Sequence, residues 1–358
     1  MMKGFLYTIS FFIFFSTSAQ QSLVTDGPYI FYKADSILIE SIHNDVVQKE
    51  VFKNTQRPSS VNVAVPGSAG AFFTVPLKQN ILIPATDYKK TDKVFALSDI
   101  EGNFHGLQKL LLAGGVIDEQ LNWNYNNGHL VVCGDIMDRG EEVTASLWLL
   151  YKLEEEARSK GGFVHIILGN HEIMNLSEDI RYVHPKYIQV STLLGRNYHE
   201  LYAANTELGK WLRSKNIMER IGNSLFLHAG VSEAINSGGY SLKKINHLAR
   251  PYYDKDGYDS ILIKAGVTTI YDSYTSPFWY RGYFTNPTAP LSQVQSTLSL
   301  FNVKRIIVGH TLVENIKTLY NGRVIAIDVN HHAGNHQALL IENNIPHRLT
   351  INGEKIKL

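Results

Sequence analysis

Five short apolar runs in this sequence each end in a side chain that can bind a metal ion. Each run has the length and composition of a buried β-strand. Ligands in open α/β sheets lie just beyond the carboxyl ends of the strands, so side chains at these positions would converge on one pocket. Oxygen and imidazole ligands together suit divalent ions such as Mn, Fe or Zn. The residues concerned are Asp99, Asp135, Asn170, His228 and His310.

The second of these runs carries the densest group of reactive residues. Val131-Val132-Cys133 is followed by Gly134-Asp135-Ile136-Met137-Asp138-Arg139-Gly140. An Asp at the strand end can reach a metal ion, and the Asp138–Arg139 pair can reach a phosphate, because guanidinium makes bidentate, permanently charged contacts to phosphate oxygens. Two metal ions about 3.5–4 Å apart stabilise the attacking and leaving oxygens of phosphoryl transfer. The pattern therefore predicts phosphate-ester chemistry.

The elements that would position these residues alternate between strands and helices from residue 93 onward, which predicts an α/β fold. Apolar stripes at helical spacing predict helices near 104–111, 143–153, 198–215 and 290–301. Residues 323–351 predict an antiparallel meander, with Asn352-Gly353 as a hairpin turn. Residues 20–92 contain short β-prone runs and turn signals but no motif, which predicts an N-terminal β-rich extension before a domain at 93–358.

The first 19 residues have the pattern of a cleavable secretory signal peptide. Lys3 precedes an apolar run at 5–15, and Thr17-Ser18-Ala19 supplies a small-residue cleavage site. The run is shorter than the roughly 20 residues that span a bilayer, and no other segment could cross one. We therefore expect an exported protein, periplasmic or secreted, without a membrane span in its mature form. The 34 basic residues balance 33 acidic ones, which argues against a nucleic-acid partner.

The ordered motifs of the chain resemble those of the calcineurin-like metallophosphoesterases. Within that family they resemble the phosphoprotein-phosphatase branch, and most closely the Shewanella-like protein phosphatases. The resemblance covers roughly residues 93–330 and implies a β-sandwich flanked by helices. It rests on Asp99-Ile100-Glu101-Gly102-Asn103, Gly134 to Gly140, Leu168-Gly169-Asn170-His171-Glu172-Ile173-Met174-Asn175, His228-Ala229-Gly230, Trp279-Tyr280-Arg281-Gly282 and Gly309-His310-Thr311.

This resemblance implies a site for two divalent metal ions and a metal-bridging hydroxide as the nucleophile. Mn is the preferred ion, with Fe, Zn or Mg as the other candidates. Carried over residue by residue, the ligands are Asp99 for the first ion, Asp135 for both ions, and Asn170, His228 and His310 for the second.

The resemblance also implies an acid and a phosphate clamp. His171 would protonate the leaving oxygen, a task that suits a group titrating near neutral pH. Asp138 would orient His171 and keep it cationic. Arg139 and Arg281 would hold the phosphate; a surface ion pair is the alternative for Arg281.

Glu101 departs from the family pattern, which has His two residues after the first Asp. We expect Glu101 to bind the first metal ion and to shift the preference toward Mn or Mg, because a carboxylate is harder and adds negative charge. The alternative is a weak first site, with His105 or His331 as a distant substitute. His331 and His332 are expected to be exposed to solvent, with a position near the rim of the pocket as the alternative.

These observations predict a two-metal phosphomonoesterase that acts on phosphorylated protein or peptide. A phosphoprotein phosphatase for Ser/Thr or Tyr, with phosphotyrosine favoured, is the first hypothesis. A dinucleoside polyphosphate hydrolase or other small-molecule phosphoesterase is the second. The third is a degenerate, non-catalytic protein that binds metal or phosphate, inactivated by Glu101.

Overall fold

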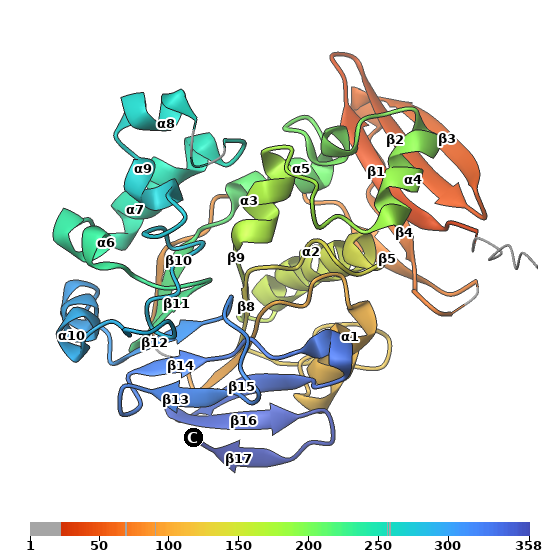
Figure 1. Ribbon diagram of the computed structural model, residues 1–358. Coiled ribbons are helices and arrows are strands. Elements are labelled where there is room, and N and C mark those ends of the chain that lie inside the picture. Colours follow the sequence, from red (N-terminus) through yellow and green to blue (C-terminus); the bar gives the residue numbers. More distant parts are fainter. Residues whose placement is uncertain (1–22, 69, 90, 256, 258) are drawn as a thin grey trace, which may run out of the picture.

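The core of the protein is a sandwich of two six-stranded β-sheets. The computed structural model describes residues 23–358 except 69, 90, 256 and 258, so the expected signal peptide lies outside the described residues. The first sheet has the order β17-β16-β15-β7-β8-β9 (Figure 1). The strands β7 (Lys93–Leu97), β8 (His129–Cys133) and β9 (Phe163–Ile167) run parallel at one side of this sheet, and β15 (Gln337–Glu342) joins β7 antiparallel.

The second sheet has the order β13-β14-β12-β11-β10-β6. Its members are β6 (Asp87–Tyr88), β10 (Met218–Ile221), β11 (Ser224–Leu227), β12 (Arg305–Val308), β13 (Lys317–Leu319) and β14 (Val324–Ala326). Apolar side chains from both sheets, such as Val131, Ile167, Phe226 and Ile307, form one buried cluster. Shared burial of this kind holds two sheets face to face, and the predicted α/β sandwich is confirmed.

Helices cover the outer faces of the sandwich. The long helix α2 (Val143–Ser159) packs on β9 and also contacts α1 (Phe104–Ala113), while α7 (Leu242–Ala249) packs on β10. The other helices are α3 (Asn170–Leu176), α4 (Pro185–Leu194), α5 (Glu207–Ser214), α6 (Glu233–Gly238), α8 (Ser260–Ala265), α9 (Thr268–Tyr271) and α10 (Leu291–Leu300), with short 3-10 turns η1 (Asn54–Gln56), η2 (Tyr198–Tyr202), η3 (Arg250–Tyr252) and η4 (His331–Ala333). Within the described part of the chain, no helix is both long and apolar enough to span a membrane.

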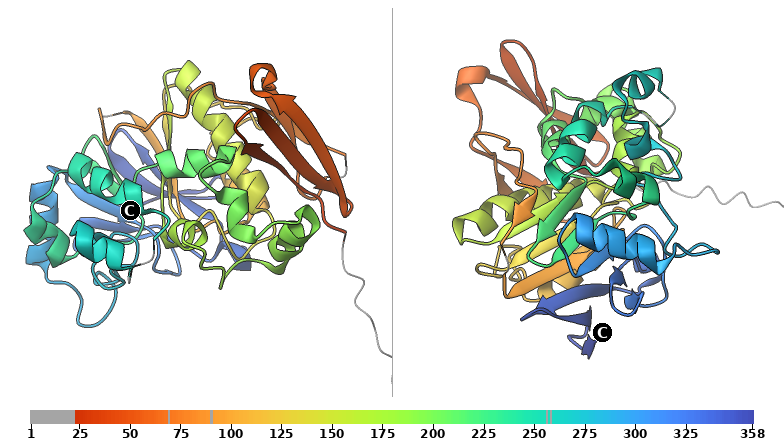
Figure 2. Two further views of the ribbon diagram at one scale, coloured as in Figure 1. Left: turned by 90° about the horizontal axis from the view of Figure 1, so that it is seen from above. Right: turned by 90° about the vertical axis from the view of Figure 1, so that its left-hand side faces the viewer.

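The N-terminal extension forms a three-stranded antiparallel sheet and a separate hairpin. The sheet contains β1 (Asp26–Tyr32), β2 (Ser36–His43) and β3 (Val46–Lys53), and the hairpin contains β4 (Ser60–Ala64) and β5 (Phe72–Pro76). Both views in Figure 2 show the red sheet at one side of the molecule, away from the C-terminal strands. Its apolar residues belong to the same hydrophobic cluster as α2 and α5. The boundary at residue 92 stays a prediction.

Two predicted elements differ from the structure. The helix predicted over 198–215 is wrong, because η2 ends at Tyr202 and Thr206 begins α5 by accepting a hydrogen bond from Gly209 N at 3.0 Å. The predicted meander holds only for β15, β16 (Ile345–Thr350) and β17 (Lys355–Lys357). The preceding strand, β14, pairs in parallel with β12 in the other sheet, where Ile325 is buried between the sheets.

An ion pair between the buried Lys215 and the partly buried Glu154, next to α5, makes a testable contribution to stability. Lys215, whose side chain is 1% exposed, lies 2.5 Å from Glu154 Oε1. Lys215 and Lys78 lower the pKa of Glu154 to about 2 even though burial opposes this shift. The pair therefore stabilises the fold above the ordinary Glu pKa of about 4.3, and this contribution is lost as the pH falls toward 2.

We expect Lys215→Met to lower the free energy of unfolding at pH 7 by about 1.5–3 kcal/mol, the usual contribution of a hydrogen bond to a charged group, because Glu154 keeps Lys78 at 3.2 Å and Trp211 Nε1 at 2.7 Å as partners. Urea denaturation measures this change. Lys243→Met, at an exposed position of α7, is the control and should change stability little. A loss below about 1 kcal/mol in Lys215→Met would show that the pair contributes no more than a surface pair.

Candidate active site

The predicted site residues gather where strands of the two sheets end. Asp99 follows β7, Asp135 follows β8 and Asn170 follows β9, all in the first sheet. His228 follows β11 and His310 follows β12, in the second sheet. Close contacts between Asp135 and His228 join the two groups. The site therefore lies at one end of the sandwich, as the strand-end pattern predicts.

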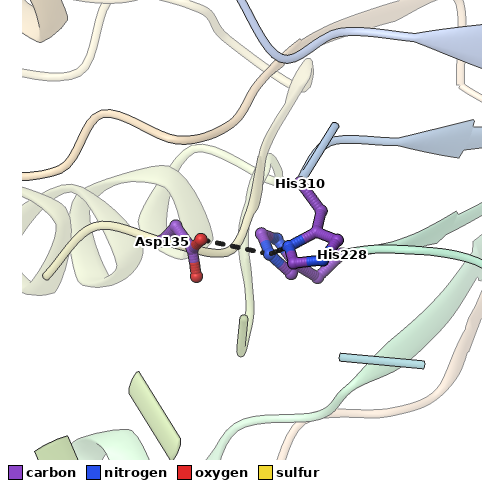
Figure 3. Close-up of side chains that lie close together, drawn as sticks. All are labelled: Asp135, His228 and His310. Carbon is purple, nitrogen blue, oxygen red and sulfur yellow. Dashed lines mark hydrogen bonds and ion pairs between the residues drawn. The ribbon is translucent and has the colours of Figure 1, made fainter. Parts of the chain in front are cut away.

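Four of these side chains bring atoms that can bind a metal ion close to His228 Nε2. His228 Nε2 lies 2.9 Å from Asn170 Oδ1, 3.2 Å from Asp135 Oδ2 and 3.2 Å from His310 Nδ1; Figure 3 shows Asp135 and the two histidines facing one another. His228 Nδ1 donates to the Cys133 carbonyl at 2.7 Å, which leaves the Nε2 lone pair free for a ligand.

The residues at this point fit a divalent metal ion. Separations of about 3 Å are those of ligand atoms that share one ion through bonds of about 2.1 Å. All four side chains are buried, and His310 Nε2 has no hydrogen-bond partner among the described residues. Asp99 lies beside this cluster, where its Oδ2 accepts from His310 N at 3.0 Å, and burial raises its pKa.

Glu101 faces the same site from the other side of Asp135. Ligand atoms of Glu101, Asp135 and His171 lie within 4.8 Å of one another, which makes a second candidate metal group. Glu101 Oε1 is 2.8 Å from Arg139 Nε, and Glu101 Oε2 is 3.8 Å from His332 Nε2. Burial, together with the nearby carboxylates, raises the pKa of Glu101 to about 8. A cation at this position would relieve the repulsion between these carboxylates.

The two histidines considered as substitutes for Glu101 have other neighbours. His105 Nε2 lies 3.5 Å from Glu142 Oε1 on the exposed side of α1. His331 is only 2% exposed, so its predicted exposure is wrong. Its ring stacks on His336, and its carbonyl accepts from Asn103 Nδ2, so the loop after β14 folds inward. His332 is exposed, as expected.

His171 and Asp138 form a hydrogen-bonded pair next to the metal groups. His171 Nδ1 lies 2.6 Å from Asp138 Oδ2, and Asp138 Oδ1 accepts from Asn175 Nδ2 at 2.8 Å. Burial disfavours the imidazolium, but Asp135 and Asp138 raise the pKa of His171 to about 9. The side chain is therefore held in place with its Nε2 proton directed toward Glu101 and Asp135, each 3.8 Å away.

The two arginines occupy the more open side of the site. The side chain of Arg139 is 50% exposed, and its guanidinium lies over the Tyr182 ring. Arg281 Nη1 donates to the His310 carbonyl at 2.9 Å and to Thr311 Oγ1 at 3.1 Å. Among the described residues no carboxylate lies within 4 Å of Arg281, so the structure gives it no surface ion pair. Both guanidinium groups can bind a phosphate from solvent by donating N–H hydrogen bonds to its oxygens.

Glu172 organises the site, although the sequence pattern assigned it no role. Its buried carboxylate accepts hydrogen bonds from the backbone N–H groups of Gly169, Asp135, Ile136 and Met137 at 2.8–3.1 Å. It thereby joins the loops after β8 and β9 while Asp135 adopts a left-handed φ of 55°, a conformation that costs energy and persists only under such constraint. A Glu at the third position of helix α3 is the available sequence signal.

Asp328 is a second buried acidic residue near the site for which the sequence pattern gave no prediction. It follows β14 and is buried, and burial together with Asp99 and Glu101 raises the pKa of its carboxyl group. It matches the pattern of a polar residue after a buried strand, which is the signal that could have identified it.

Comparisons with known proteins agree with this geometry. The family model described as calcineurin-like phosphoesterase matches residues 93–314. The crystal structure of a cold-active protein-tyrosine phosphatase from a psychrophile, Shewanella sp., superposes with a TM-score of 0.85 at 35% identity, covering 94% of this chain and 99% of that one.

Two curated relatives carry Shewanella-like protein phosphatase names. Shewanella-like protein phosphatase 1 of Plasmodium berghei is 29% identical over 62% of this chain and 62% of its own length. Shewanella-like protein phosphatase 2 of Arabidopsis thaliana is 26% identical over 71% of this chain and 75% of its own length. The resemblance seen in the motifs is thus confirmed. The chain belongs to the calcineurin-like phosphoesterase family, and it is a metal-dependent hydrolase of phosphoric ester bonds.

Proposed function

We propose that this protein is a two-metal phosphoprotein phosphatase that prefers phosphotyrosine. The observation that carries the proposal is the pairing of His171 with Asp138 directly beside a buried group of metal-ligand atoms. A protein that only bound metal or phosphate would need no oriented acid, so this pairing argues against a degenerate binding protein.

Six side chains supply the ligands for two divalent ions in this proposal. When bound, such ions act as Lewis acids that lower the pKa of a water molecule and neutralise phosphate charge. The mixture of carboxylate, amide and imidazole donors suits Mn best, with Fe, Zn or Mg as alternatives. Asp99, Glu101 and Asp135 would hold the first ion, and Asp135, Asn170, His228 and His310 the second; Asp135 serves both.

The chain's own residues divide the remaining work. Arg139 and Arg281 bind the non-bridging phosphate oxygens through charge-assisted hydrogen bonds. Arg139, whose Nε lies 2.8 Å from Glu101 Oε1, would have to give up this ion pair if Glu101 held a metal ion. His171 gives its Nε2 proton to the leaving oxygen, which would otherwise depart as an unstable anion. Asp138 holds the imidazole in the tautomer and orientation for that transfer.

Aromatic side chains on two sides of the site support the preference for phosphotyrosine. The Tyr182 ring is 5.2 Å from the His171 ring, and the Trp279 ring is 5.7 Å from the His310 ring. Tyr182 is 45% exposed. An aromatic leaving group can pack against such rings in stacked or edge-to-face contact. The similarity to the Shewanella protein-tyrosine phosphatase supports the same preference.

Turnover of a substrate panel tests the proposal. The mature protein is assayed with Mn, Mg and Zn on phosphotyrosine peptide, phosphoserine peptide and a dinucleoside tetraphosphate. We expect the highest kcat/KM with Mn and phosphotyrosine peptide. A higher kcat/KM for the dinucleotide would support the small-molecule alternative, and no turnover of any substrate would support the degenerate binder.

Replacing Glu101 by His tests its role as a ligand. We expect Glu101→His to lower the KM or inhibition constant for phosphate roughly fivefold, since removing one negative charge near a dianion is worth about 1 kcal/mol or more. It should also raise the affinity for Zn relative to Mn, because imidazole is the softer ligand. Metal titration and the pH–rate profile measure both effects. If metal stoichiometry, metal preference and pH profile all stay the same, Glu101 is not a ligand.

We also propose that the protein is exported, on the signal-peptide pattern of residues 1–19. This proposal is tested by expressing the protein in a bacterium and determining its N-terminus by mass spectrometry in the medium, the periplasm and the cytoplasm. We expect a mature N-terminus close to Gln20 in the medium or the periplasm. Protein found only in the cytoplasm, with residues 1–19 still attached, would contradict export.

A further inference from the structure

A cavity lies between the N-terminal extension and the phosphatase part of the chain, on elements that carry none of the proposed catalytic residues. Its volume is about 590 Å³. Tyr32 and Arg57 line one side, residues 78–81 and Ile83 line another, and α5 with Arg250 completes the wall. Figure 1 shows α5 next to β1, which it contacts. The size lies within the range of sites for small organic molecules.

The lining of this cavity is strongly basic. Five cations, Arg57, Lys78, Lys210, Arg213 and Arg250, face it together with one carboxylate, Glu207. That carboxylate is already engaged, because Arg57 Nη2 lies 3.2 Å from both of its oxygens and the Tyr151 hydroxyl donates to it. Lys78 has its own partner, Glu154, at 3.2 Å.

Three of the five cations have no carboxylate within 4 Å among the residues that the structure describes. They are Lys210, Arg213 and Arg250. Burial lowers the pKa of Lys210, and the neighbouring Arg57 lowers it further, while Glu207 opposes the shift. Burial also lowers the pKa of Arg213, against the attraction of Asp254. Lys210, whose ammonium lies 3.7 Å from the centre of the Tyr32 ring, and Arg57 thus repel each other in a partly desolvated space, and an anion would relieve this repulsion.

The guanidinium groups are held in place before any ligand arrives. Arg213 Nη1 donates to the carbonyls of Tyr202 and Gly209, and Arg250 Nη2 donates to Asn216 Oδ1 and the Lys215 carbonyl. Because backbone carbonyls and an amide already hold these two guanidinium groups, little side-chain entropy is lost when an anion binds next to them.

We propose that this cavity is a second anion site, which binds a small phosphate-bearing ligand. Guanidinium and ammonium groups are the donors that recognise phosphate oxygens. The amides of Gln79 and Asn80 and the apolar Ile81 and Ile83 also line the cavity, and they offer contacts to an organic group. Free phosphate and a phosphorylated metabolite share this chemistry, and the test separates them.

Sulfate, which the enzyme does not hydrolyse, is the first probe. Thermal unfolding of the purified full-length mature protein is followed against sulfate at constant ionic strength, with chloride as the reference salt. We expect saturable stabilisation in the wild type and a roughly tenfold weaker apparent affinity in Lys210→Glu, from the loss and reversal of one charge. Lys210→Gln, a milder change, should lie between them.

Two control variants separate this site from the surface and from the catalytic centre. Lys243→Glu changes an exposed lysine on α7, and Arg281→Ala removes a proposed catalytic clamp. Both should keep the wild-type sulfate affinity at the cavity. An unchanged affinity in Lys210→Glu, loss of the effect in Arg281→Ala instead, or the absence of saturable stabilisation in the wild type would each overturn the proposal.

A non-hydrolysable nucleoside diphosphate with a methylene bridge is the second probe. Tighter binding than sulfate, weakened in Lys210→Glu, supports a phosphorylated organic ligand. Binding equal to that of sulfate and weakened to the same extent supports inorganic phosphate. Nucleotide binding that Lys210→Glu leaves unchanged counts against the site.

Discussion

Replacing His171 by Ala is expected to lower kcat for a phosphotyrosine peptide by about 10²–10⁴-fold, the usual contribution of a general acid. The reason is geometric as well as electrostatic. His171 is buried, its Nδ1 is bonded to Asp138 at 2.6 Å, a contact that favours the imidazolium, and its Nε2 faces the candidate metal groups. Steady-state kinetics with the metal-loaded variant measures the loss.

A leaving-group comparison distinguishes acid catalysis from general damage to the site. An activated aryl phosphate leaves without a proton, so His171→Ala should lose far less activity on it than on a phosphoserine peptide. Asp138→Asn should also lose less activity on the activated aryl phosphate than on the phosphoserine peptide, but by a smaller factor, because it misorients His171 without removing it. Equal losses on all substrates would mean that His171 only shapes the site.

Replacing Asp135 by Asn is expected to lower both metal content and activity, the latter by about 10³-fold or more, since metal ions contribute several kcal/mol to such reactions. Asp135 Oδ2 is 3.2 Å from His228 Nε2 and 3.8 Å from His171 Nε2, so one carboxylate serves both metal groups. No other described side chain belongs to both groups. Elemental analysis of the purified variant measures the bound metal.

The backbone contact of Asp135 supplies the control for this variant. Its Oδ1 accepts from His171 N at 2.9 Å, a contact that the Asn amide oxygen can keep. We therefore expect the metal-free Asp135→Asn protein to remain folded, with a thermal midpoint close to that of the metal-free wild type. Retention of two ions per chain in this variant would show that Asp135 does not bridge the two groups.

The sequence predicted which residues gather at the strand ends better than it predicted the parts of the fold around them. Strand ends such as Asp135 and His228 follow uninterrupted apolar runs, so their position at the edge of a sheet could be derived from the pattern alone. Glu172 could not be found in this way, because its role lies in accepting backbone N–H groups from two loops that only the fold brings together.

The remaining differences arise from contacts between distant segments. The apolar stripe of 198–215 is continuous, yet a turn ends η2 before Thr206 begins α5. The apolar run of β14 gives no sign of which sheet it joins, and packing between the sheets decides. The basic cavity brings together Arg57, Lys210 and Arg250 from three separated regions of the chain. No local sequence pattern could therefore have predicted this cavity.

Metal stoichiometry measured together with turnover is the sharpest test of the proposed two-metal phosphatase. Metal-free protein is titrated with Mn while phosphate release from a phosphotyrosine peptide and bound metal are both followed. We predict that full activity coincides with two bound ions per chain. The Asp135→Asn variant should reach neither full activity nor two bound ions. Full turnover by the metal-free protein, or maximal activity with one ion or none bound, would contradict a two-metal mechanism.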